Sequence, residues 1–338
     1  MTSDRDSESL RPIRATLADV AASAKVSKMT ASRALSKTSR AVMRPETRAR
    51  VIAAAAELGY ERNPLAGGLT GAATGIVAIL VPDLANAVFA DLISGIQEGL
   101  AADDTQTIVA RTGFEPEAEL EAIRRLLRWN PDAFVLTGPR RAPEAAGLLR
   151  GRGISCVEAM DLPSDPIDMA VGFHHSAAGC MAADHLIETG ARSLAAITAN
   201  PADSRARTRV DAFTARVAER TGQTVSRFES DDVSGIGLGR VLCRRLLEAG
   251  NYDAVFTAND LLGAGAYIEC RARGVDVPGE LAICGFNDLP LAAELFDGLT
   301  TIHSPRREIG RRVADLLRSP TPRAILTLDC SLVRRGST

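Results

Sequence analysis

From Gly75 onward, short apolar runs alternate with helix-like stretches, and this alternation limits the fold more than any other feature of the chain. The first runs are IVAILV, TQTIVA, AFVLTG and ISCVEA, and a second set lies at residues 193–198, 224–228, 254–257 and 281–286. Between them, apolar residues recur at helical spacing, as in Ile93, Ile96 and Leu100. Parallel strands buried on both faces have this pattern. We therefore predict two doubly wound parallel sheets, each in its own lobe.

The segments that follow these strands are rich in carboxylates and amides. Ligands of open α/β sheets bind beyond the carboxyl ends of the strands. The polar residues there are Asp83, Asn86, Asp161, Arg209, Asn259, Asp260, Asn287 and Asp288. Carboxylates, amides and one Arg make paired hydrogen bonds to the vicinal hydroxyls of a sugar or to a carboxylate. Taken singly, each residue is also a common helix cap or turn former, so both interpretations stay open.

Residues 16–35, TLADVAASAKVSKMTASRAL, have the pattern of two short helices joined by a tight turn. Thr16 and Asp19 have the spacing of a capping box, so the first helix is predicted to begin at Leu17. Ser27 is a second N-cap. The small apolar residues expected to pack between the helices are Leu17, Val20, Ala21, Ala24, Ala31, Ala34 and Leu35. This stretch predicts a helix-turn-helix.

The second of these helices presents Lys28 and Met29 on its first turn. In a helix-turn-helix this turn enters the major groove of DNA, where a long donor reads guanine and an apolar side chain contacts a thymine methyl group. Thr30, Ser32 and Arg33 are placed to contact bases or phosphates. Two amphipathic helices with exposed cations are also an ordinary protein surface, so this stretch alone leaves both interpretations open.

A third helix is predicted from Pro45 and Glu46, which suit the first turn of a helix. Gly59 is expected to end it. Its apolar positions, expected to close a three-helix core, are Val51, Ile52, Ala55 and Leu58.

Residues 11–62 carry eleven basic and four acidic side chains, so with an overall charge of −2 the rest of the chain carries −9. A cationic head on an acidic body is typical of nucleic-acid binding, although solvated surface charge explains it equally well.

The ordered motifs VAxxxxVSxxTxSRAL, RPETRxRVxxAAxELGY and NPxAxxL resemble those of the LacI family of bacterial transcription repressors, over nearly the whole chain. KMTASR and EAMDLPSDPIDMAVGF are most similar to the gluconate-utilisation repressors of that family. The resemblance implies a homodimer, or a dimer of dimers, that binds double-stranded operator DNA and a sugar-acid effector. It implies DNA contacts from Thr16, Ser27, Lys28, Met29, Thr30, Ser32, Arg33, Asn63, Ala66 and Leu69. It implies effector contacts from Asp161, Phe173, Arg209, Asn259 and Asn287, and the predicted effector site also includes Asp83, Asn86 and Phe89.

The linker at residues 61–74 has two interpretations. Its Pro64 and small residues are the composition of a free linker. In the resembled family this segment folds into a hinge helix on operator DNA, with Leu69 in the minor groove and Ala66 facing its floor. Gly67 stands where that family usually has Arg, and Gly68 follows. This removes one phosphate contact and makes a helix costlier by about 1 kcal/mol per Gly.

Two further departures from the family pattern affect the turn and the cleft. Lys25 stands where the family usually has Gly, so a non-glycine residue with positive φ is expected in the turn. Asn287 stands where an Asp is frequent, which leaves one negative charge fewer against an acidic ligand. The resemblance thus favours gluconate or a phosphorylated or keto derivative, with Arg209 pairing with its carboxylate.

Other functional classes find little support in the sequence. Gly235, Gly237 and Gly239 precede Arg240 with no strand close before them, which indicates a loose helix start rather than a dinucleotide fingerprint. There is no P-loop or GxSxG motif and the four His lack metal-ligand spacing, so no enzyme activity, cofactor or metal is expected. Six Cys without a CxxC pair indicate reduced thiols in a cytoplasmic protein. As a DNA-binding regulator it is expected to be nucleoid-associated. No apolar run of about 18 residues occurs, so no membrane span is expected.

We therefore predict an all-α helix-turn-helix head and an α/β two-lobed body resembling periplasmic binding proteins. The predicted segments are a disordered lead-in at 1–13, the head at 14–60, a hinge helix or linker at 61–74 and an effector-binding, dimerising body at 75–338. The body's lobes are expected at about 75–171 with 304–320, and at 172–303 with 321–338, the chain crossing near Val171, His303 and Pro320. The predicted function is a LacI-type repressor. The alternative is a cytosolic sugar-binding protein with a vestigial DNA-binding head.

Overall fold

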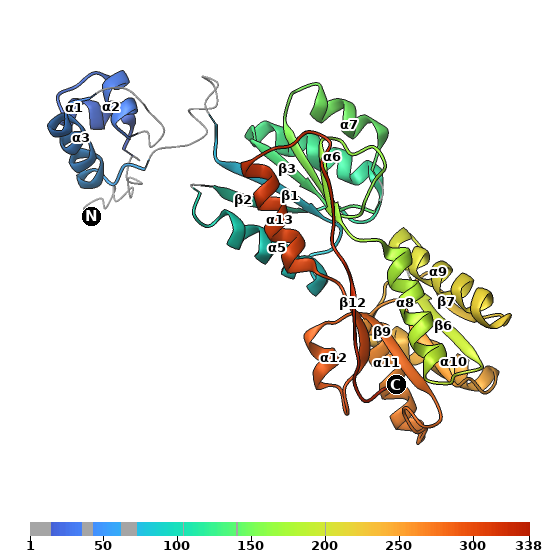
Figure 1. The fold of residues 1–338 in the computed structure, drawn as a ribbon. Helices are drawn as coiled ribbons and strands as arrows, with labels where there is room; N and C mark the ends of the chain where they lie inside the picture. Colours follow the sequence, from blue (N-terminus) through green and yellow to red (C-terminus); the bar gives the residue numbers. More distant parts are fainter. Residues whose placement is uncertain (1–14, 36–42, 62–72, 104, 140, 200) are drawn as a thin grey trace, which may run out of the picture. The chain divides into compact units, whose positions relative to one another are not determined.

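The computed structural model describes residues 15–35, 43–61, 73–103, 105–139, 141–199 and 201–338 (Figure 1). Contacts divide the chain into two units, residues 1–72 and 73–338. The first is an all-α head and the second an α/β body, as predicted from the sequence. The predicted contacts Asn63, Ala66 and Leu69, and the glycines at 67 and 68, lie outside the described residues.

Three helices form the head: α1 (Leu17–Ser23), α2 (Lys28–Leu35) and α3 (Pro45–Glu57). The capping box before α1 is confirmed, because the Thr16 backbone N–H donates to Asp19 Oδ2 at 2.8 Å and the Asp19 N–H points back to Thr16 Oγ1. At α2 the Ser27 hydroxyl accepts the Thr30 backbone N–H at 3.1 Å. The buried residues of this core are Val20, Ala21, Ala24, Ala31, Ala34, Val51, Ala54 and Ala55.

Two of the four residues predicted to face inward from the third helix do not. Ile52 is 51% exposed and Leu58 is 40% exposed, whereas Val51, Ala54 and Ala55 are buried. The inward stripe follows the spacing i, i+3, i+4, which leaves Ile52 off the stripe, and Leu58 lies at the C-cap beyond the last helical residue.

Backbone conformation confirms two other predictions about the head. Lys25 has a φ of 53° in the turn between α1 and α2, and Gly59 has a φ of 60° after α3. A left-handed conformation is ordinary for Gly, but at Lys25 it is strained.

The first sheet of the body has the strand order β11-β5-β4-β3-β1-β2, and all neighbours are parallel. The strands are β1 (Ile76–Val81), β2 (Gln106–Arg111), β3 (Ala133–Leu136), β4 (Ser155–Met160), β5 (Met169–Gly172) and β11 (Ile325–Thr327). The helices of this lobe are α5 (Ala87–Leu100), α6 (Pro116–Leu126), α7 (Pro143–Arg150) and α13 (Arg306–Arg318), with a 3-10 turn at Leu127–Trp129. Strand β1 is buried at every position, because α5 with α13 packs on one face and α6 with α7 on the other.

The second sheet has the order β12-β10-β9-β8-β6-β7 and is parallel except for the edge pair β10 and β12. The strands are β6 (Leu194–Ala199), β7 (Ser226–Ser230), β8 (Ala254–Thr257), β9 (Ala282–Asn287), β10 (Thr300–His303) and β12 (Ser331–Val333). The helices are α8 (His175–Glu188), α9 (Ser204–Thr221), α10 (Ile236–Ala249), α11 (Asp260–Arg273) and α12 (Pro290–Glu294). Figure 1 shows the chain returning from the second sheet to α13 of the first lobe and then passing back to the second lobe.

The three crossings between the lobes occur after β5, after β10 and between β11 and β12. The first two lie near Val171 and His303, where they were predicted. The third does not lie near Pro320: β11 still pairs with β5 of the first sheet, so the chain crosses between Thr327 and Ser331. Assigning residues 321–328 to the second lobe was therefore wrong, because parallel pairing along β5 keeps them in the first.

Candidate functional site

The exposed side of α2 holds the residues predicted to read DNA. Lys28, Met29 and Arg33 are exposed, with Met29 63% accessible, and Thr30 and Ser32 are half-buried. A large apolar side chain exposed on the first turn of a helix is the arrangement needed to contact a thymine methyl group.

Three hydroxyls in the predicted DNA-contact set already have partners inside the head. Thr16 Oγ1 donates to Asp19 Oδ2 at 2.7 Å, and Ser27 Oγ lies 2.9 Å from Thr30 Oγ1. Ser27 and Thr16 thus fix the starts of the two helices, and each is exposed. The residues of this set that the structure describes lie on α2 or at these two caps.

A cavity of about 300 Å³ lies between the two lobes of the body, and we call it the Arg209 cavity. Six of the eight predicted effector residues line it: Asp83, Asn86, Phe89, Arg209, Asn259 and Asn287. They come from the ends of β1, β8 and β9 and from helices α5 and α9, as expected for strand ends that meet at one edge.

Arg209 lies at the floor of this cavity and is 4% exposed. Its Nε and Nη2 donate to the carbonyl oxygen of Ala258 at 3.2 and 2.9 Å, and Nη1 donates to His175 Nδ1 at 2.9 Å. The guanidinium also lies 4.0 Å above the Phe286 ring. Burial lowers the pKa of Arg209 to about 10, so it is still charged at neutral pH. Within the described chain no carboxylate forms an ion pair with it.

Three amide side chains around the cavity use their carbonyl oxygens locally. Asn86 Oδ1 accepts the Val88 N–H at 3.1 Å, Asn259 Oδ1 accepts the Leu262 N–H at 3.0 Å, and Asn287 Oδ1 accepts the Ser304 hydroxyl at 3.3 Å. The cap interpretation is thus correct for Asn86 and Asn259. Since their amide N–H groups donate to no residue that the structure describes, these remain available to ligand oxygens.

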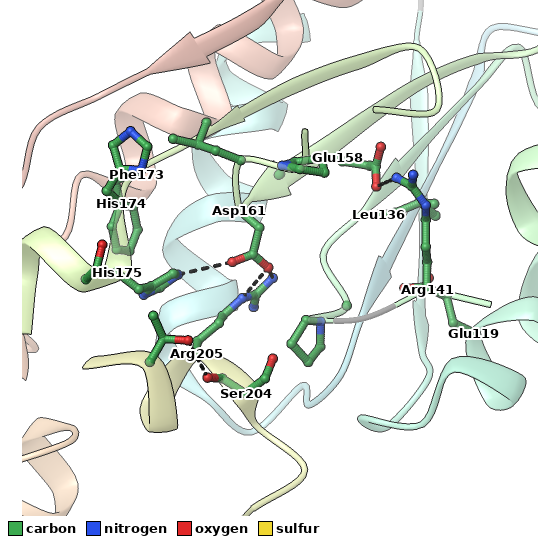
Figure 2. A pocket seen from close by; sticks show the side chains of 17 residues that line it. Glu119, Leu136, Arg141, Glu158, Asp161, Phe173, His174, His175, Ser204 and Arg205 are labelled. Carbon is green, nitrogen blue, oxygen red and sulfur yellow. Dashed lines mark hydrogen bonds and ion pairs between the residues drawn. The ribbon is translucent and has the colours of Figure 1, made fainter. Parts of the chain in front are cut away.

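The other two predicted residues, Asp161 and Phe173, line a neighbouring cavity of about 400 Å³. Asp161 accepts the Arg205 Nε–H at 2.6 Å, and its other oxygen lies 3.3 Å from His175 Nε2 (Figure 2). Burial alone would raise the pKa of Asp161, but the Arg205 guanidinium and His175 hold it well below its usual range. Arg205 also donates to the carbonyl oxygen of Thr137 at 2.8 Å, so α9 of the second lobe is tied to two strand ends of the first.

Arg205 and His175 line both cavities, and the sequence did not identify either. Arg209 can only donate, so His175 Nδ1 must accept and the imidazole proton lies on Nε2, toward Asp161. Burial lowers the pKa of His175 to about 4, so the ring is neutral at pH 7. The available signal for Arg205 was a pair of polar residues, Ser204 and Arg205, at the start of α9, the helix that follows β6.

No described helix is long and apolar enough to cross a bilayer. Over the same residues, no group of three or more His, Cys, Asp or Glu side chains is arranged to hold a metal ion.

Comparisons with known proteins match both units. The family model described as "Bacterial regulatory proteins, lacI family" matches residues 16–63, and one described as a periplasmic binding protein-like domain matches residues 183–338. The HTH-type transcriptional regulator GntR of Pseudomonas aeruginosa is 38% identical over 90% of this chain and 88% of its own. The regulator of the same name from Escherichia coli K12 is 32% identical over 96% and 98%. A LacI family transcriptional regulator of known structure from Silicibacter pomeroyi has 32% identity and a TM-score of 0.87, covering 96% and 99%.

Proposed function

Because the chain belongs to the LacI family of bacterial regulatory proteins, we propose that it is a repressor whose operator binding is controlled by a small sugar acid, gluconate or a phosphorylated or keto derivative. The regulatory class itself follows from the family: the protein is a LacI-type DNA-binding transcriptional repressor and not an enzyme. The parts proposed here are the identity of the effector, the homodimer, the DNA contacts and, as effector contacts, the six predicted residues that line the Arg209 cavity.

The observation that carries the effector assignment is the hydrogen bonding of Arg209. Three of its five N–H groups are used, which leaves one on Nη1 and one on Nη2. Two adjacent N–H donors of a guanidinium fit the two oxygens of a carboxylate. The amide N–H groups of Asn86, Asn259 and Asn287 then suit the hydroxyls of a polyol chain. The carboxylates of Asp83 and Asp203 lie at partly exposed positions of the same cavity, where hydroxyl donors reach them.

The effector assignment predicts a difference between an acid and its neutral alcohol. Titration calorimetry should detect gluconate, 2-ketogluconate or 6-phosphogluconate at or below millimolar concentration, whereas sorbitol, which lacks the carboxylate, should bind at least about tenfold more weakly. Arg209→Lys keeps the charge but loses the paired N–H donors, so it should weaken acid binding by about tenfold or more. No heat from any of the three acids at millimolar ligand would rule out the assignment.

Ligand binding can change operator affinity because the cavity joins the two lobes. A ligand held by Asn86, the N-cap of α5, and by Arg209 on α9 stabilises one arrangement of the lobes over another. In a dimer, that arrangement sets the spacing of the two heads, which must match half-sites about one helical turn apart. We expect a catabolic effector of this kind to act as an inducer.

Lys28→Ala tests the proposed reading head. If Lys28 reads a base, its loss should relax discrimination at a single operator position by about 1–3 kcal/mol, measured by gel shift with single-position operator variants. The operator is first selected from random duplexes, and binding should weaken steeply with salt. An equal loss on every operator variant would instead make Lys28 a phosphate contact. Failure to shift any duplex at low salt would favour a sugar-binding protein with a vestigial head.

A further inference from the structure

The second cavity of the body, which we call the Glu119 cavity, is separated from the Arg209 cavity by the Arg205, Asp161 and His175 cluster. Its volume of about 400 Å³ lies within the range of small-molecule sites. It is lined by the first turn of α6, the segment after β3, the end of β4 and the starts of α8 and α9. Its lining differs in charge from that of the Arg209 cavity, and this difference indicates a different ligand.

Two cations line the Glu119 cavity among the residues that the structure describes, and each pairs with a carboxylate of the same cavity. Arg141 pairs with Glu158, and Arg205 pairs with Asp161 (Figure 2). The second oxygen of Glu158 accepts the Ile167 N–H at 2.6 Å. An anionic ligand would therefore have to displace a carboxylate from one of these partly buried pairs, which is unfavourable.

One carboxyl group of the cavity has no such partner. Glu119 lies in the first turn of α6, is 3% exposed and lines the cavity, yet its Oε2 is buried without a hydrogen-bond partner. A buried polar atom left unpaired is unfavourable, so a ligand that supplies a donor recovers that cost. Burial raises the pKa of Glu119 to about 7, with the Gly138 N–H opposing the shift and Glu158 reinforcing it. Among the described residues, the lining of the cavity thus holds three carboxyl groups, Glu119, Glu158 and Asp161, against two guanidinium groups.

We infer that the Glu119 cavity is a second ligand site, distinct from the sugar-acid site, which takes a small hydroxylated amine with its ammonium group at Glu119 Oε2. Hydroxyl-bearing residues on the opposite wall, Ser176 of α8 and Thr208 of α9, suit the ligand's hydroxyls. Since Arg205 and His175 line both cavities, an occupant of one site meets the same side chains as an occupant of the other. This site does not depend on the sugar-acid assignment.

The test compares two sugars that differ at one group. The full-length protein is titrated with glucosamine and with glucose at neutral pH, and glucosamine should bind at least tenfold more tightly. Glu119→Gln keeps the size of the side chain but removes the charge, so it should weaken glucosamine binding at least tenfold. Glu117→Gln, an exposed position on the same turn, should leave it unchanged. Thermal unfolding of both variants confirms that they are folded.

Three results would overturn the inference. These are no glucosamine heat at millimolar concentration, equal binding of glucose and glucosamine, or a Glu119→Gln variant that folds and binds glucosamine as the wild type does. Gluconate distinguishes this site from the proposed effector site. The Glu119→Gln substitution should change the affinity of the protein for gluconate less than twofold. If gluconate does not bind the wild type at all, the effector assignment fails while the glucosamine comparison still decides this site.

Discussion

Gly179→Ala is expected to lower the free energy of unfolding of the body by about 3 kcal/mol, the upper end of the usual range for overpacking. Gly179 lies on α8 where α8 packs against α9. An added Cβ would come far inside 3.0 Å of the Arg209 carbonyl oxygen and would lie 3.0 Å from the Phe213 backbone nitrogen. Both are backbone atoms, so the helices must separate instead of a side chain turning aside. Urea unfolding of the purified protein measures the loss.

Gly147→Ala is the matched control, because Gly147 lies in the exposed face of α7 with nothing within 4 Å of its added Cβ. There the higher helix propensity of Ala should raise stability by about 0.5–1 kcal/mol. The Gly→Ala substitution should thus lower the free energy of unfolding at position 179 and raise it at position 147. A stable Gly179→Ala variant would mean that α8 and α9 are less closely packed than the structure has them. Since the clash is with Arg209, this variant should also bind sugar acids more weakly.

Most of the predictions that the structure confirms depend on patterns among residues close together in the sequence. The capping box at Thr16 and Asp19 depends on residues three apart, so it is readable from sequence, and the structure has it. Strand β1 consists entirely of buried apolar residues and was recognised within one residue. The polar residues after β1, β8 and β9 meet because parallel strands share a carboxyl edge, which is a property of the fold class.

The parts that were missed depend on contacts between distant segments. Strands β10 (TTIH) and β12 (SLV) lack the run of at least three apolar residues by which the equally short β3 and β8 were recognised, so only their neighbours make them strands. Arg205 and Arg209 are both arginines of one helix, and nothing local shows that the first pairs with Asp161 while the second does not. The carboxyl group of Glu119 looks like an ordinary first-turn acid until α6 is packed against β3 and β4.

Asp260→Ala is expected to cost about 2–4 kcal/mol of stability at pH 7. The sequence placed Asp260 among the polar residues at the strand ends, but the structure buries it completely at the start of α11. Its two oxygens accept the Leu289 N–H at 2.7 Å and the Thr301 hydroxyl at 2.6 Å. Truncation leaves both donors buried without an acceptor, so the connections from α11 to the segment after β9 and to β10 are lost together. Denaturant unfolding measures the cost.

Asp260→Asn separates the loss of hydrogen bonds from the effect of charge. The amide keeps one acceptor oxygen, so at low pH its cost should be about half that of Asp260→Ala. Burial raises the pKa of Asp260 to about 6, so the folded wild type favours the protonated acid. The stabilisation from the protonated Asp260 is present in full below about pH 4, the pKa of Asp in the unfolded chain. It is lost as the pH rises through about 6, the pKa in the folded protein. The wild type should therefore lose about 3 kcal/mol relative to Asp260→Asn between pH 4 and pH 7. A stability difference that stays constant over this range would show that Asp260 is already ionised in the folded protein at pH 4, held by its two donors.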